Sequence, residues 1–166
     1  MCRCGPVILI ALGANLPSSA GPPAATLNAA LARLETLGVK ILRRSSFYET
    51  PAWPDPGQPA FVNAVAAVET ALQPVELLAL LHGVETAFGR MRSAPNAPRT
   101  LDIDLLDYDG RVMTGGLTLP HPRIAERSFV LVPLAEAAPE WRHPTTGQGA
   151  GELLAKLADR TTPKLL

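Results

Sequence analysis

The sequence has no net charge, because 15 lysine and arginine residues balance 15 aspartate and glutamate residues. A chain without net charge has no overall electrostatic field that would draw it to nucleic acid or to an anionic membrane. Any anionic ligand must therefore be met by a local cluster of basic side chains. We accordingly expect neither a nucleic-acid partner nor a membrane partner.

Long apolar segments and cysteines are also scarce. The apolar run at residues 7–12 is far shorter than the roughly 20 residues that cross a bilayer, and residues 1–6 lack the apolar core of a secretion signal. We therefore expect a cytoplasmic protein. Cys2 and Cys4 are the only cysteines. Their close spacing disfavours a structural disulfide and leaves a zinc site two ligands short, so we interpret both as incidental.

The apolar content is high enough for a packed core. Hydrophobic residues make up 47% of the 166 residues and charged residues 18%, as in a globular rather than a disordered chain. This length fits a single domain, and no internal repeat or linker divides the sequence. We expect one domain over residues 1–166.

Hydrophobic spacing and turn residues predict four strands and two helices in the first two thirds of the chain. Strands are predicted at residues 7–12, 39–48, 61–69 and 100–108, and helices at 26–37 and 74–89. The order βαββαβ indicates an α+β fold, the split βαβ arrangement, with an antiparallel sheet and both helices on one face. Later residues should add a short hairpin after Arg111, a helix near 130–138 and a last helix around 152–158.

The sharpest local signal is a pair of acids in the last of these strands. Alternate side chains of a strand share a face, so Asp102 and Asp104 should point one way and Ile103 into the core. Their α-carbons would lie roughly 6.5 to 7 Å apart. Two carboxylates so placed can share one or two magnesium ions with a polyphosphate. Taken alone, a half-exposed strand that happens to carry two acids would be the preferred interpretation.

A set of basic residues around the acids favours a phosphate site. These residues are Arg90, Arg92, Arg99, Arg111, Arg123 and Arg127. Arginine binds phosphate oxygens bidentately and stabilises the charge that develops in phosphoryl transfer. The alternative is that the arginines solvate the surface or pair with Glu85 and Glu126, and for Arg111 we prefer it.

A histidine and two phenylalanines complete the candidate set. His121 lies between two prolines on a rigid loop; it would contact phosphate if that loop faces the acidic strand, and would otherwise be solvated. Phe61 and Phe129 could hold a flat heterocycle between their rings, although an aromatic residue belongs to the core by default. Asn63 would share a strand face with Phe61 and could read an amino-oxo edge with its amide.

Together these motifs resemble the 6-hydroxymethyl-7,8-dihydropterin pyrophosphokinase family, and nearly the whole chain before Pro144 is covered in order. The similar segments are 12–16 (LGANL), 46–51 (SFYETP), 58–64 (QPAFVNA), 89–92 (GRMR), 98–104 (PRTLDID), 119–123 (LPHPR) and 126–134 (ERSFVLVPL). The resemblance implies a ferredoxin-like fold with a C-terminal hairpin and helices. It also implies transfer of pyrophosphate from ATP to 6-hydroxymethyl-7,8-dihydropterin, with release of AMP, in folate biosynthesis.

The resemblance also implies a role for each candidate residue. Asp102 and Asp104 are expected to hold two magnesium ions, and Phe61, Asn63 and Phe129 to bind the pterin. The expected ATP-binding residues are Glu85, Arg90, Arg92, Arg99, His121 and Arg127, of which Arg90 and Arg92 are also expected to act in catalysis. We assign no general base, because positioning and electrostatics can carry most of this catalysis.

Two departures from the family pattern stand out. Ala14 replaces the usual serine of the first turn, so the hydrogen bond of that hydroxyl is absent. The loop at residues 93–98 (SAPNAP) is one residue shorter than in the bacterial pattern and lacks its Arg-Trp pair. Closure over ATP would then depend more on Arg92 and Arg99, and the two prolines should lower the entropy cost of ordering the loop.

Two other functions remain open from the sequence. A non-catalytic ferredoxin-like module could bind a small ligand or a partner, because this fold hosts many functions, but it has no need for two acids facing an arginine cluster. A metal-dependent phosphodiesterase or nuclease could use the same carboxylates. The zero net charge and the lack of an aromatic and basic track disfavour that function.

Overall fold

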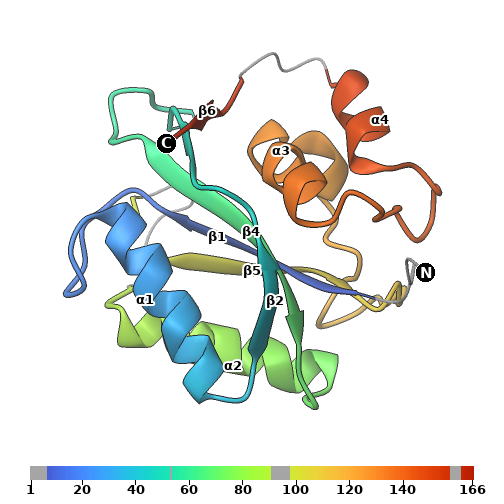
Figure 1. The fold of residues 1–166 in the computed structure, drawn as a ribbon, viewed down its shortest axis with the longest axis horizontal. Coiled ribbons are helices and arrows are strands. Elements are labelled where there is room, and N and C mark those ends of the chain that lie inside the picture. Colours follow the sequence, from blue (N-terminus) through green and yellow to red (C-terminus); the bar gives the residue numbers. More distant parts are fainter. Residues whose placement is uncertain (1–6, 53, 91–97, 158–161) are drawn as a thin grey trace.

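The computed structural model describes residues 7–52, 54–90, 98–157 and 162–166. In chain order the elements are β1 (Ile8–Ala14), α1 (Pro23–Thr36), β2 (Lys40–Arg44), β3 (Tyr48–Thr50), β4 (Phe61–Glu69), α2 (Pro74–Ala87), β5 (Asp102–Tyr108), a 3-10 turn (Ile124–Glu126), α3 (Ser128–Ala137), α4 (Ala150–Ala155) and β6 (Lys164–Leu165). Figure 1 shows the sheet lying between α1 and α2 on one side and α3 and α4 on the other.

The strands form one antiparallel sheet with β1 and β4 at its centre. Its order is β5-β1-β4-β3-β6, and β2 pairs with β4 beyond the end of β3. Along β1, residues 8–13 therefore have partners on both sides; Gly13 lies opposite Asn63 of β4 and Asp102 of β5. The predicted α+β fold with an antiparallel sheet is confirmed, and the second strand of the predicted βαββαβ order is divided into β2 and β3.

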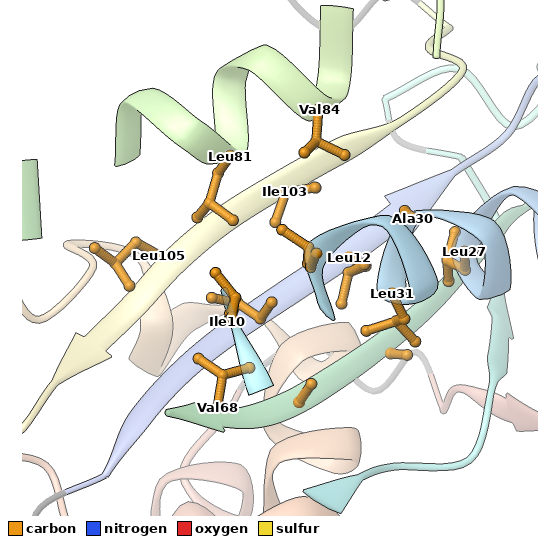
Figure 2. Packing of buried hydrophobic residues seen from close by; sticks show 14 of the residues in the cluster. Ile10, Leu12, Leu27, Ala30, Leu31, Val68, Leu81, Val84, Ile103 and Leu105 are labelled. Atoms are coloured by element: carbon orange, nitrogen blue, oxygen red, sulfur yellow. The ribbon is translucent and has the colours of Figure 1, made fainter. Parts of the chain in front are cut away.

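One face of the sheet packs against α1 and α2. Alternation along β1 turns Ile8, Ile10 and Leu12 toward these helices, where each is at most 5% exposed. Figure 2 shows Ile10 and Leu12 between side chains of both helices, such as Leu31 of α1 and Leu81 of α2. Burial of one such side chain contributes about 1.5 to 3 kcal/mol, so this layer fixes the register of β1.

The opposite face is covered by α3 and α4 over only part of its length. Leu9, Val65 and Leu106 pack there against the helices, whose buried residues include Leu131, Leu134 and Leu153. Further along the same face, the side-chain positions belong to Ala11, Gly13, Asn63, Asp102 and Asp104. Small and polar residues thus stand where the helical cover ends.

A β-bulge in β5 separates the part of this face that the helices cover from the part that they leave open. Ile10 pairs with Leu105 but Leu9 pairs with Asp107, so Leu106 is the extra residue. Leu105 and Tyr108 lie in the core under α1 and α2, whereas Leu106 packs on the α3 side. Asp107 also faces that side, where its Oδ2 accepts a 2.7 Å hydrogen bond from the Trp141 indole.

The strand predicted at residues 39–48 is wrong, because the chain forms β2 and β3 with a break between them. The pairing with β4 shifts register between Ile41 and Arg43. At the break, the Ser45 hydroxyl accepts from Val65 N–H at 3.0 Å, and the Ser46 N–H donates to Glu136 of α3. Side chains thus partner backbone groups that a continuous ladder would have used.

Smaller differences concern element ends. Pro23 is the first residue of α1, a position that proline favours, so the helix begins three residues before the predicted Thr26. The first strand continues through Ala14 instead of closing at Gly13. The last helix ends at Ala155, whereas its predicted end at residue 158 lies outside the described residues. The two-residue strand β6 was not predicted, and it pairs with β3.

The expected hairpin after Arg111 is reduced to one bridge between Met113 and Leu119. Among the described residues, none of the helices is both long enough and apolar enough to span a bilayer.

Candidate active site

A cleft lies on the sheet where the cover of α3 ends. It has a volume of about 40 Å³, and β1, β4, β5 and the start of α3 each contribute to its walls. The lining residues are Ala11, Leu12, Gly13, Phe61, Asn63, Ala64, Asp102, Asp104, Phe129 and Val130. Both predicted acids, both predicted aromatic residues and the predicted amide therefore meet at one place.

The two acids point into this cleft from β5. Ile103 between them is 1% exposed in the core under α1 and α2, so the predicted alternation is confirmed. Burial and the neighbouring Asp102 raise the pKa of Asp104 to about 6, against the opposing effect of Arg127, Arg90 and Arg99. Crowding two carboxylates in a half-buried cleft therefore favours a proton or another cation there.

Three arginines converge on the acids. Asp102 contacts Arg90 through Oδ1 at 2.6 Å and Arg99 through Oδ2 at 2.9 Å. Arg127 approaches Asp104 at 3.9 Å. Each of the three arginine side chains keeps about a quarter of its surface exposed. Their guanidinium groups can therefore still donate hydrogen bonds to an anionic ligand that enters from solvent.

Glu85 reaches the site from α2 through Arg90. Its carboxylate is 4% exposed and forms an ion pair with the Arg90 guanidinium. Arg90 therefore forms the pair with Glu85 that the sequence left open as an alternative to phosphate binding, and it contacts Asp102 at the same time. A buried carboxylate with this geometry fixes the direction of the guanidinium, so Glu85 acts on the cleft by orienting Arg90.

The backbone around Arg99 is held by Asn15, which was not among the predicted site residues. Asn15 is 2% exposed; its Oδ1 accepts from Arg99 N–H at 2.8 Å and its Nδ2 donates to Pro59 C=O at 3.2 Å. The backbone N–H of Asn15 donates to Arg99 C=O. One side chain thus ties the end of β1 to the segments before β4 and β5. The available signal was an asparagine directly after a buried strand.

Asn63 presents its amide oxygen to the cleft. Its side chain is buried, and Nδ2 donates to Thr50 Oγ1 at 2.8 Å. A β-carbon placed on Gly13 would stand 3.0 Å from Asn63 Oδ1, so glycine leaves the space that this oxygen occupies. Thr50 and Gly13 were not predicted as site residues. Both lie in segments that resemble the family, but their role could not be assigned from sequence because it depends on the pairing of β1, β3 and β4.

Phe129 differs from Phe61 in its exposure. Phe129 follows the first residue of α3 and is 36% exposed. The Arg127 guanidinium lies over its ring, 5.5 Å from the centroid. An exposed ring at the rim, stacked on a cation, can move more easily than a core residue.

His121 lies on a loop that crosses the outer edge of β5. The backbone N–H of His121 donates to Leu106 C=O at 2.8 Å, and the ring Nδ1 accepts from the backbone N–H of Arg123 at 3.1 Å. Burial lowers the pKa of His121, and Arg127 lowers it further while Asp102 opposes the change. The neutral ring therefore carries its proton on Nε2, which remains a donor.

Of the predicted basic residues Arg92 and Arg111, only Arg111 is described by the structure, and it lies away from the cleft lining. Arg111 is exposed, stacks on Tyr108 at 5.0 Å from the ring centroid, and donates to Gln73. These contacts fit the expectation that Arg111 is a surface residue and not a phosphate ligand. Arg92 and residues 93–97 of the shortened loop lie outside the described residues.

Comparison with known proteins gives one consistent result. The sequence model of the family described as 7,8-dihydro-6-hydroxymethylpterin-pyrophosphokinase (HPPK) matches residues 9–139. A 2-amino-4-hydroxy-6-hydroxymethyldihydropteridine pyrophosphokinase of Methylorubrum extorquens is 43% identical over 145 residues, 86% of this chain and 90% of the relative. The protein with the same description from Synechocystis is 39% identical over 151 residues, 90% of this chain and 75% of the relative.

Solved structures agree on the fold. The chain is similar to the wild-type HPPK-DHPS of Plasmodium falciparum with a TM-score of 0.70 at 15% identity. The match covers 92% of this chain and 41% of the Plasmodium chain, so the present chain spans less than half of that protein.

Proposed function

The chain belongs to the 7,8-dihydro-6-hydroxymethylpterin-pyrophosphokinase family, and on that premise we propose that it makes a folate precursor at the cleft beside Asp102 and Asp104. The reaction is transfer of pyrophosphate from ATP to 6-hydroxymethyl-7,8-dihydropterin, with release of AMP. The observation that carries the assignment to this cleft is the meeting of two carboxylates and three arginines with Phe61, Asn63 and Phe129.

The pterin would bind between Phe61 and Phe129. Stacking suits a flat bicyclic ring, and Asn63 Oδ1 can accept a hydrogen bond from its amino group. The cleft of about 40 Å³ is far below the roughly 300 Å³ of the smallest typical ligand pockets. Phe129 would therefore have to swing outward when the ring enters, which its position at the rim allows.

The ATP phosphates would lie against Arg90, Arg99, His121 and Arg127. These groups supply charge and a neutral imidazole donor around the acids. Arg92 and Glu85 belong to the same proposal, Arg92 as a further phosphate contact and Glu85 through the orientation of Arg90.

The donor set also fits magnesium. No group of three or more His, Cys, Asp or Glu able to hold a metal occurs within the described parts of the chain. Mg²⁺ is commonly held by one or two carboxylates together with substrate phosphates, and the pair Asp102 and Asp104 provides two. Two magnesium ions bound with ATP would neutralise phosphate charge and shape the polyphosphate.

The transfer itself would be an in-line displacement at the β-phosphorus. The pterin hydroxyl oxygen forms a bond to this phosphorus, the bond to the oxygen that bridges it to the α-phosphorus breaks, and AMP leaves. The hydroxyl proton passes to solvent. Arginine side chains fix the phosphates and balance the charge that builds on the leaving oxygen, so positioning and electrostatics carry the rate.

The test is to incubate the protein with ATP, Mg²⁺ and 6-hydroxymethyl-7,8-dihydropterin and to identify the released nucleotide. AMP and a diphosphorylated pterin in equal amounts are expected. Release of ADP would contradict the proposal by indicating transfer of a single phosphoryl group. Pterin binding without any nucleotide product would instead favour the non-catalytic ligand-binding module. For variants of Asp102 or Asp104, Asp109→Asn is the matched control, because Asp109 is an exposed acid beyond the end of β5.

A further inference from the structure

Glu136, near the end of α3, accepts hydrogen bonds from Ser46, in the break between β2 and β3, and from Tyr48, the first residue of β3. Its Oε1 accepts from Ser46 N–H at 2.8 Å and from the Ser46 hydroxyl at 2.6 Å, and its Oε2 accepts from the Tyr48 hydroxyl. Three donors on one carboxylate form a set of charge-assisted hydrogen bonds. They join a helix to the strand segment that leads into β3.

At neutral pH, the protonation states of Glu136 and Tyr48 both favour the hydrogen bond between them. Burial raises the pKa of Glu136, but the hydrogen bonds from Ser46 and Tyr48, with Arg44, lower it by more. The bond to Glu136 is the main reason that the pKa of Tyr48 is raised to about 12. At neutral pH the carboxylate is therefore ionised and the phenol keeps its proton.

β3 connects this cluster to the cleft. The strand has only three residues, and Tyr48 lies opposite Asn63 of β4 while Thr50 lies opposite Phe61. Thr50 is 5% exposed, and its hydroxyl accepts the hydrogen bond from Asn63 Nδ2. With the nitrogen end of the amide held by Thr50, Oδ1 is directed at the cleft.

We propose that Glu136 is a positioning residue for pterin binding: by holding Ser46 and Tyr48 it fixes the place of β3, and β3 orients Asn63 through Thr50. The inference rests on the proposed function of the cleft. Glu136 itself lies outside the residues that line the cleft. The inferred route from Glu136 runs through β3, which contacts Asn63 on the pterin side of the site.

The experiment compares Glu136→Ala with the wild-type protein in steady-state kinetics and in direct binding of the pterin. We expect the pterin KM and Kd to rise roughly three- to tenfold, the scale of one or two partly exposed hydrogen bonds. The ATP KM should stay within about twofold, because Asp102 holds Arg90 and Arg99 independently of Glu136. Glu136→Gln keeps an acceptor for Ser46 and should recover part of the pterin affinity.

A double-mutant cycle with Thr50→Val tests the route. If Glu136 acts through Thr50, Glu136→Ala should change pterin affinity much less in the Thr50→Val background than in the wild type. Glu140→Ala, at an exposed glutamate just beyond α3, is the control and should change neither KM. Thermal unfolding shows whether each variant is folded at the assay temperature, and Tyr48→Phe provides a milder change if Glu136→Ala is not.

Equal losses for pterin and ATP, additive effects in the cycle, or an unchanged pterin KM in folded Glu136→Ala would each overturn the inference. None of these outcomes affects the proposed function, which fails only if the wild-type protein releases no AMP.

Discussion

Gly13 of β1 and Asn63 of β4 lie directly opposite each other, and a β-carbon on Gly13 would stand 3.0 Å from the Asn63 amide oxygen. That separation is shorter than an ordinary van der Waals contact. Asn63 is held from its other side by Thr50, so its oxygen has little room to retreat. The glycine is therefore required by the space that the amide needs.

Gly13→Ala should weaken pterin binding by roughly tenfold and leave ATP binding within about twofold. The added methyl group would push the Asn63 oxygen out of line, and a lost or misdirected buried hydrogen bond costs on the order of 1 kcal/mol or more. Calorimetric titration with each substrate measures both affinities. Gly83→Ala is the matched control, because a β-carbon there meets nothing within 4 Å and Gly83 lies within α2. Undiminished pterin affinity in Gly13→Ala would contradict this reading of the cleft.

Asp102→Asn and Asp104→Asn should each reduce turnover by about two orders of magnitude or more, because each removes charge from the proposed metal-binding pair. The fold should survive, since both side chains face the cleft and Ile103 keeps its place in the core. Asp102→Asn should also raise the ATP KM more than Asp104→Asn does, because Asp102 holds both Arg90 and Arg99.

Turnover is measured by AMP release at saturating substrate, and folding by circular dichroism. Asp109→Asn controls for the loss of one negative charge near β5. Wild-type turnover in either cleft variant would remove the corresponding residue from the proposed metal site.

The fold was predictable wherever local pattern and tertiary contacts agree. The strand at residues 61–69 was predicted to the residue, because a mostly apolar run rich in valine and alanine follows a proline-rich loop there. The second helix began at Pro74 as predicted, with Glu76 at the third position of a capping box. In the segment 39–48, by contrast, strand propensity gave the wrong result. There the Ser45 hydroxyl and the distant Glu136 partner the backbone instead.

The candidate site divides in the same way. Period-two alternation alone predicted that Asp102 and Asp104 share a face, and that Phe61 and Asn63 share one. A cluster of arginines around the acids was expected from the sequence, but the pairing of Arg90 and Arg99 with Asp102 was not, because it depends on how α2 and the segment before β5 pack. Gly13 and Asn15 received no role from the sequence, because glycine and asparagine after a strand most commonly serve only to form a turn. Their actual contacts cross between strands that are remote in the sequence.

Phe129→Ala should weaken pterin binding by more than tenfold, because it removes one of the two rings proposed to stack on the substrate. ATP binding should fall too, but by less, because the Arg127 guanidinium lies over the Phe129 ring and loses that support. Fluorescence titration with each substrate separates the two effects. Phe129→Leu keeps apolar volume without an aromatic face and should recover little pterin affinity. Equal losses for both substrates would count against stacking.

The buried Asp107 should make stability depend on pH in a direction opposite to that of a surface salt bridge. Its side chain accepts from the Trp141 indole at 2.7 Å and from Gly110 N–H at 2.9 Å. Burial nevertheless raises the pKa of Asp107 above its ordinary value of 3.8. The folded state thus holds this proton more tightly than the unfolded state, so the contribution of Asp107 to stability falls as pH rises through the range just above that value.

Denaturant unfolding of the wild type and of Asp107→Asn at pH 4 and pH 7 measures this effect, because titration of the other acids cancels in the difference between the two proteins. We expect the free energy of unfolding of the wild type, relative to Asp107→Asn, to be smaller at pH 7 than at pH 4. Trp141→Phe removes a hydrogen bond that favours the ionised carboxylate, so in that background the decrease should be steeper. A difference that grows with pH would mean that the hydrogen bonds outweigh burial at Asp107.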